Sequence, residues 1–78
     1  MADGFSPIFA ANLRRLRRAK GLTQQRLAEK ADMDRAFLSK IETGLAYPGL
    51  KVIGKLVGAL EANPDELLKP PRGKGRGR

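Results

Sequence analysis

The chain has 78 residues, enough for one small domain, with 16 Lys and Arg against 8 Asp and Glu and a net charge of +8. Cysteine and histidine are absent, which excludes disulfides, thiolate or imidazole metal sites and Cys- or His-dependent catalysis, so we expect no metal, no cofactor and no enzymatic activity. No apolar run reaches the length of a membrane span, and residues 1–20 lack a signal-peptide pattern, so we expect a cytoplasmic, nucleoid-associated protein with a polyanionic partner.

The positive charge is unevenly distributed along the chain. Residues 69–78 hold five cations and no acid, which leaves a net charge of +3 on residues 1–68. We predict a flexible N-terminus over residues 1–5, a folded domain over residues 6–69 and a disordered basic tail over residues 70–78. The tail either adds non-specific, salt-dependent DNA affinity or serves only as a solubilising end.

The first predicted helix starts with Ser6 as its N-cap and Pro7 at its first helical position, and it runs to about Lys20, where Gly21 stops it. Its apolar face has the helical spacing i, i+4, i+7, and the rest of its surface is basic. The apolar face is made by Phe9, Leu13 and Leu16.

A second predicted helix, 24–31, begins after the N-cap Thr23 and turns Leu27, Ala28 and Ala31 inward. The turn 32–34 leads to a third helix, 35–43, which Asp34 caps, whose inner residues are Leu38 and Ile41 and which Gly44 ends. A fourth helix spans about 50–61, and a fifth starts at the Asn63-Pro64 cap signature and contains Leu67 and Leu68. In the fourth helix, Gly54 and Gly58 either permit close helix packing or are simply tolerated.

Two short helices joined by a three-residue turn, within a set of five, predict an all-α, compact five-helix bundle with a helix-turn-helix. The stretch LRRLRRAKGLTQQRLAEKADMDRAFLSKIETG resembles the phage-repressor and Cro-like helix-turn-helix family, also called the XRE family. The resemblance covers about residues 12–68. It implies a lambda-repressor-like DNA-binding domain whose third helix enters the major groove.

The resemblance implies that the first turn of the third helix reads base edges. The arginine fork of Arg35 suits guanine O6 and N7, and the methyl group of Ala36 suits thymine. Asp34 either accepts from a cytosine amino group or is a plain N-cap. The predicted base-reading set is Arg35, Ala36, Ser39 and Lys40.

Phosphate contacts are expected around this helix. Gln24 stands at a helix N-terminus, where the dipole favours an anion; the alternative is a solvated glutamine. Phe37 either packs on thymine or the sugar backbone or is partly buried against the second helix. The cations of the first helix either bind phosphate or are solvated. The predicted set is Gln24, Arg14, Arg15, Arg18, Thr23, Phe37, Thr43 and Tyr47.

The family pattern also implies a structural ion pair, Arg17 with Glu42, that orients the third helix. A narrower resemblance is to restriction-modification controller proteins, which usually have Tyr where this chain has Phe37. Two departures stand out: Asp32 occupies a turn position often held by glycine, and the loop 44–48 lacks the Lys or Arg of many relatives. Asp tolerates the left-handed conformation that such a turn needs.

The first functional hypothesis is a transcriptional regulator, a repressor by default, that binds a palindromic double-stranded DNA operator as a homodimer. An autoregulatory restriction-modification controller is one form of it. The alternative is a protein-interaction module, an antitoxin or adaptor with weak DNA specificity. The expected dimer surface lies in the C-terminal part of the chain and comprises Leu50, Val57, Leu67 and Leu68. No small-molecule effector is evident.

Overall fold

The computed structural model describes residues 5–70, and these form five helices without a strand. This confirms the predicted all-α, five-helix fold. The predicted flexible start and basic tail lie outside the described residues, apart from Phe5 and Pro70. The helices are α1 (Phe5–Ala19), α2 (Gln24–Lys30), α3 (Arg35–Glu42), α4 (Leu50–Leu60) and α5 (Pro64–Leu68).

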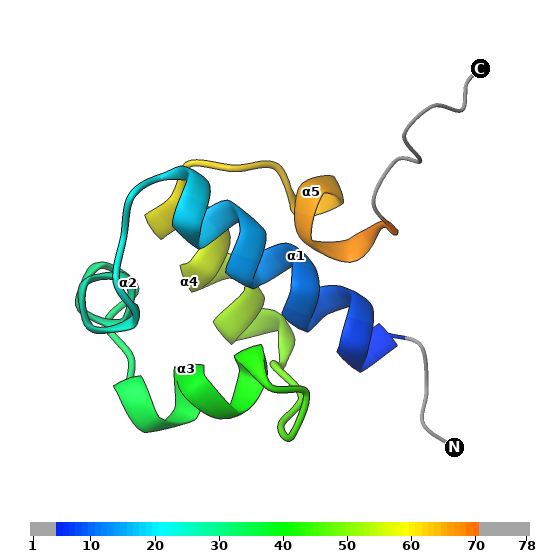
Figure 1. Cartoon of the computed structure of the whole chain (residues 1–78), viewed down its shortest axis with the longest axis horizontal. Helices are drawn as coiled ribbons and strands as arrows, with labels where there is room; N and C mark the ends of the chain where they lie inside the picture. The colour runs from blue at the N-terminus through cyan, green and yellow to red at the C-terminus, as the bar shows by residue number, and fades with distance from the viewer. Residues whose placement is uncertain (1–4, 71–78) are drawn as a thin grey trace.

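Helix α1 is the element around which the others are arranged. It crosses the middle of the molecule, with α5 packed on one side and α3 on the other (Figure 1). Helix α2 contacts both α3 and α4, and α4 contacts α5. The two helices of the predicted helix-turn-helix therefore lie side by side, and the C-terminal end of the described chain lies across α1 from α3.

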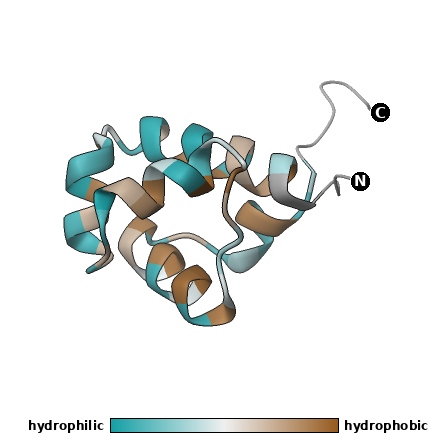
Figure 2. Ribbon diagram, turned by 90° about the horizontal axis from the view of Figure 1, so that it is seen from below, coloured by the Kyte–Doolittle hydropathy of each residue, from teal (hydrophilic) through white to brown (hydrophobic). Residues whose placement is uncertain are grey.

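One apolar cluster, drawn from all five helices, forms the core. The inward faces predicted from helical spacing in the first three helices are buried as expected. In Figure 2 brown, apolar turns lie on the inner sides of several helices, and further brown turns lie along the lower edge of the view. The cluster comprises Phe9, Leu13, Leu16, Leu27, Ala28, Ala31, Leu38, Ile41, Leu56, Leu60 and Leu67.

Four helices end in the same way, with a residue in the left-handed conformation just after the last turn. At each of these ends, the residue after the left-handed one donates its N–H to the carbonyl five residues earlier, as Leu22 does to Arg17 at 3.0 Å. These bonds satisfy carbonyls that have no partner within the helix. Asp32, with φ of 55°, takes this position between α2 and α3, as its tolerance of that conformation predicts. The four residues are Gly21, Asp32, Gly44 and Glu61.

Some helix ends differ from the prediction. Helix α1 begins at Phe5, so Ser6 is not an N-cap and Pro7 stands in the first turn, where its missing N–H leaves no unmade bond. Thr23 is the expected N-cap of α2, because its Oγ1 accepts from the Arg26 N–H at 3.0 Å. Asp34 and Asn63 occupy N-cap positions, but neither side chain makes a capping hydrogen bond.

The predicted dimer surface needs one correction. Leu67 is fully buried in the core of its own chain, because α5 packs its side chain against α1 and α4, so a second copy cannot reach it. Val57 is half-buried and packs on the core, whereas Leu50 and Leu68 are exposed.

A Cβ added at Gly54 or Gly58 of α4 meets nothing within 4 Å, so packing within the chain does not require either glycine.

We expect Glu61→Gly to stabilise the protein by about 1 kcal/mol, because a side chain in the left-handed conformation costs about 1–2 kcal/mol and glycine avoids that cost. Glu61 has φ of 54° and is exposed. Urea unfolding followed by circular dichroism measures the change. Glu61→Ala, which keeps a Cβ and removes the charge, is the control; equal stability of the two variants would contradict a backbone effect.

Candidate nucleic-acid interface

Helix α3, the predicted recognition helix, is anchored on its inner side. Leu38 and Ile41 are buried in the core, and α3 packs against both α1 and α2. Its last residue, Glu42, is only 1% exposed despite its charge. A helix held along one side and at one end presents its opposite side in a fixed orientation.

The charge of Glu42 is compensated by a buried pairing with Arg17 of α1. Arg17 Nε lies 2.7 Å from Glu42 Oε2, and Arg17 Nη2 donates to Glu42 Oε1 at 3.1 Å, so the pair is bidentate. Arg17 is 9% exposed, and its Nη1 also donates to the Leu22 carbonyl at 2.8 Å. Buried ions are tolerated when their hydrogen bonds are made in this way. The pairing ties the C-terminal end of α3 to α1.

Gln24, the first residue of α2, links the two ends of α3. Its Nε2 donates to Glu42 Oε1 at 3.0 Å, and its Oε1 accepts from Arg35 Nη1 at 3.5 Å. The side chain predicted to grip a phosphate is therefore hydrogen-bonded within the protein. The Gln24 amide therefore connects Arg35, the first residue of α3, to Glu42, the last residue of α3 and a member of the buried ion pair.

The four predicted base-reading residues all lie on α3. Arg35, Ala36 and Lys40 are exposed, and Ser39 is half-buried. They stand away from the buried pair Leu38 and Ile41, so the anchored side and the outward side of the helix are distinct. Asp34, whose carboxylate caps no N–H, is exposed at the start of this surface. We call Arg35, Ala36, Ser39 and Lys40 the reading face.

The three α1 arginines predicted to bind phosphate differ in their surroundings. Arg14 is half-buried, and its Nη1 donates to the main-chain carbonyl of Glu42. Arg15 is exposed, and its Nη2 donates to Asn12 Oδ1 at 3.3 Å. Arg18 is exposed, and within residues 5–70 no hydrogen bond or ion pair holds its guanidinium. Arg18 is thus the cation of α1 best placed for an external anion.

The remaining residues predicted to contact phosphate also differ in their surroundings. Thr23 uses its hydroxyl oxygen as an acceptor, which leaves its proton available to donate. Thr43 directs its single hydroxyl proton to the carbonyls of Ser39 and Lys40, both at 3.1 Å. Phe37 is half-buried against the core, which agrees with the burial alternative rather than an exposed ring. Tyr47 is exposed in the loop between α3 and α4.

Asn12 is a structural residue that the sequence reading missed. It is completely buried, and its Nδ2 donates to the carbonyls of Leu67 and Lys69, both at 2.8 Å. These bonds satisfy open carbonyls at the end of α5 and fix that end to α1. The available signal was its spacing, because Asn12 falls on the same helical face as Phe9 and Leu16.

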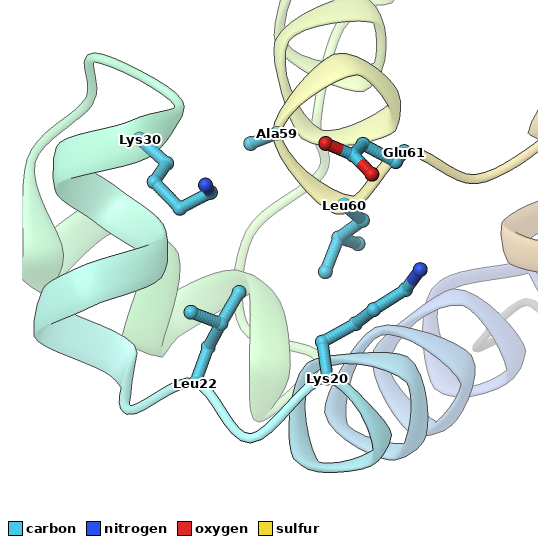
Figure 3. Close-up of a pocket in the computed structure, with 6 residues that line it drawn as sticks. All are labelled: Lys20, Leu22, Lys30, Ala59, Leu60 and Glu61. Atoms are coloured by element: carbon cyan, nitrogen blue, oxygen red, sulfur yellow. The ribbon is translucent and has the colours of Figure 1, made fainter.

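The hollow in Figure 3 lies elsewhere, where the C-terminal ends of α1, α2 and α4 come together, and its volume is about 140 Å³. Leu60 is buried at its floor, while Lys20, Lys30 and Glu61 are exposed to solvent at its rim. None of the predicted DNA contacts lines it. Within residues 5–70 there is also no metal-binding group of His, Cys, Asp or Glu side chains, and no described helix combines the length and apolar character of a membrane span.

Comparison with known proteins matches residues 8–69 to the family described as Helix-turn-helix domain. The SPbeta prophage-derived HTH-type transcriptional regulator YonR of Bacillus subtilis is 39% identical over 62 residues, which are 80% of this chain. The chain spans only 57% of the length of YonR. Control protein C.BamHI of Bacillus amyloliquefaciens is 32% identical over 69 residues, which cover 87% of this chain and 85% of C.BamHI.

Solved structures agree with this assignment. The restriction-modification controller protein C.AhdI from Aeromonas hydrophila superposes with a TM-score of 0.77 at 40% identity, covering 80% of this chain and 94% of C.AhdI. The controller C.Esp1396I, solved as a tetramer in complex with its natural 35-base-pair operator, gives a TM-score of 0.76 at 26% identity and covers 80% of this chain and 82% of C.Esp1396I. The chain therefore belongs to the helix-turn-helix domain family, among XRE-type regulators that include restriction-modification controller proteins.

Proposed function

We propose that this protein is a transcriptional regulator that binds a specific double-stranded DNA operator through the reading face of α3. The observation that carries the proposal is the two-sided character of this helix: Leu38, Ile41 and Glu42 are buried, while Arg35, Ala36 and Lys40 face solvent. An α-helix of this kind fits the major groove of B-DNA. The likeness to C.Esp1396I, which was solved on its operator, supports the same use of the fold.

The roles within the reading face follow from donor chemistry. Arg35 presents a planar fork that matches guanine O6 and N7, a contact worth about 1–3 kcal/mol of discrimination. The methyl group of Ala36 suits the thymine methyl, and Ser39 and Lys40 supply further donors along the groove. Arg18 and Thr23 are the proposed phosphate contacts, since each keeps a donor that no group within residues 5–70 accepts.

One such domain reads only a few base pairs, so we propose that a homodimer binds an inverted repeat with half-sites about one helical turn apart. The exposed apolar residues favour the segment before and at the start of α4 as the dimer interface. Leu45 is 79% exposed and Leu50 is 87% exposed, and Tyr47 lies between them in the sequence. Exposed apolar groups gathered in one short segment are typical of an interaction site. We call Leu45, Tyr47 and Leu50 the apolar segment.

We expect Leu50→Glu to weaken the dimer at least about tenfold, because a charge would be buried in the centre of the interface without a partner. Sedimentation over a concentration series measures the dissociation constant. Binding to a single half-site should be unchanged, while binding to the full repeat should fall. The matched variant is Leu68→Glu on α5: if it, rather than Leu50→Glu, yields monomers, the interface lies on α5 and the apolar segment is excluded.

The operator is identified by selecting bound sequences from a pool of random DNA. We expect enrichment of one motif with two-fold symmetry, and guanine at the position that Arg35 reads. Failure to enrich any motif would contradict sequence-specific binding and favour the protein-interaction module. The likeness to C.BamHI and C.AhdI supports an autoregulatory controller, which predicts that the enriched motif occurs upstream of the protein's own coding sequence.

A further inference from the structure

Arg14 holds the end of the recognition helix by a contact that the basic character of α1 does not suggest. It lies one turn before Arg17, so both arginines extend from the same side of α1 toward α3. Arg17 binds the carboxylate of Glu42, and Arg14 Nη1 donates to the main-chain carbonyl of the same residue. Glu42 is thus held by α1 at both its side chain and its backbone.

The carbonyl of Glu42 belongs to the last turn of α3, where no helical N–H is available as a donor. Carbonyls earlier in the helix are already paired: the Ser39 carbonyl accepts from the Thr43 N–H, and the Ile41 carbonyl accepts from the Gly44 N–H. Arg14 supplies the donor that Glu42 lacks. A guanidinium at this position is also favoured by the partial negative charge of a helix C-terminus.

We propose that Arg14 is a positioning residue for α3 and not a phosphate ligand. The inference rests on the proposed reading of DNA by α3. The contact from Arg14 fixes the backbone of Glu42 in addition to its side chain, and so restricts tilt of the helix end further than the ion pair and the buried side of α3 do. Arg35 lies seven residues away, about 10 Å along the axis, so a tilt of about 10° at Glu42 displaces it by about 2 Å. Such a displacement moves the guanidinium of Arg35 out of hydrogen-bonding distance of the base that it reads.

The two roles predict different dependence on DNA sequence and on salt. A phosphate ligand contributes equally on every DNA sequence, and its loss lowers the slope of log affinity against log salt by about 0.9. A positioning residue contributes only where the reading face meets its cognate bases. Its loss therefore lowers cognate affinity and leaves both the affinity for random DNA and its salt slope unchanged.

The test compares wild type, Arg14→Met and Arg18→Met of the full chain by fluorescence anisotropy on the selected operator and on a scrambled duplex, across a salt series. Methionine keeps an unbranched, helix-compatible side chain and removes every donor and the charge. Arg18→Met is the matched control, because Arg18 lies one turn further along α1, carries the same charge and is exposed.

For Arg14→Met we expect cognate affinity to fall about tenfold, with scrambled-DNA affinity and its salt slope as in wild type. For Arg18→Met we expect a similar fall on both duplexes and a slope smaller by about 0.9. A fall on both duplexes with a reduced slope for Arg14→Met would overturn the positioning role. Lower thermal stability with an unchanged cognate-to-scrambled ratio in the folded protein would overturn it as well.

If Arg14→Met does not fold, the same comparison with Arg14→Ala, which favours helix formation and also removes every side-chain donor, decides by the same criteria. The wild-type measurement separates this inference from the proposed function. No preference of wild type for its selected operator would contradict DNA reading itself. A clear wild-type preference that Arg14→Met retains would contradict only the role of Arg14.

Discussion

Replacing Glu42 with alanine is expected to lower the free energy of unfolding by about 3–5 kcal/mol, the usual result of removing one partner from a buried ion pair. The variant leaves Arg17, only 9% exposed, without its counter-ion, and it also removes the acceptor of Gln24 Nε2. Small domains have about 0.05–0.15 kcal/mol of stability per residue, or about 4–12 kcal/mol for a chain of this length, so the variant should lose at least a quarter of its stability. Urea unfolding followed by far-UV circular dichroism measures the loss.

The control for this prediction removes both charges together. In Arg17→Met/Glu42→Leu no buried ion remains unpaired, and apolar side chains occupy both positions, so stability should return to within about 1–2 kcal/mol of wild type. A loss below about 1 kcal/mol in Glu42→Ala would contradict the buried pairing. The double variant should nevertheless bind its operator more weakly, because it lacks the bidentate contact that orients α3.

Arg35→Ala is expected to reduce affinity for the selected operator by about 1–3 kcal/mol, which is roughly 5- to 150-fold, while affinity for scrambled DNA changes little. The reason is that Arg35 is exposed at the first turn of α3 and Gln24 already orients its guanidinium. Binding of wild type and variant to both duplexes at one salt concentration measures the effect.

A second selection from random DNA extends this test. Arg35→Ala should relax the base preference at one position in each half-site and leave the other positions as they were. Lys30→Ala, which removes a positive charge at the far end of α2, is the control and should alter neither affinity nor the motif. Equal losses on operator and scrambled DNA for Arg35→Ala would show that its charge, and not its fork, matters.

Helical spacing and cap residues predicted the five helices and most of the core, because side-chain periodicity records which face of each helix is buried. The left-handed residue at Asp32 was likewise predictable from the turn. Leu67 was assigned to the dimer surface because periodicity identifies an apolar residue but not the partner that buries it; α5 of the same chain does so here.

The polar contacts were harder to predict for a different reason. The basic face of α1 reads as a set of equivalent cations, yet Arg14 faces the end of α3 while Arg18 faces solvent, and only the packing angle between two helices decides this. Asn12 bonds to carbonyls more than fifty residues away, and no local pattern encodes such a partner. The same packing joins Gln24 to both ends of α3.

The central claim is that α3 reads DNA sequence, and the most direct test is the ratio of wild-type affinities for the selected operator and for a scrambled duplex of equal length. Both are measured by anisotropy at one physiological salt concentration. Sequence-specific proteins of this size typically prefer their site by about 10³-fold or more, and we expect a ratio in that range. A ratio near one, with affinity that depends only on salt, would contradict sequence reading by α3 and leave only the attraction of a basic protein to a polyanion.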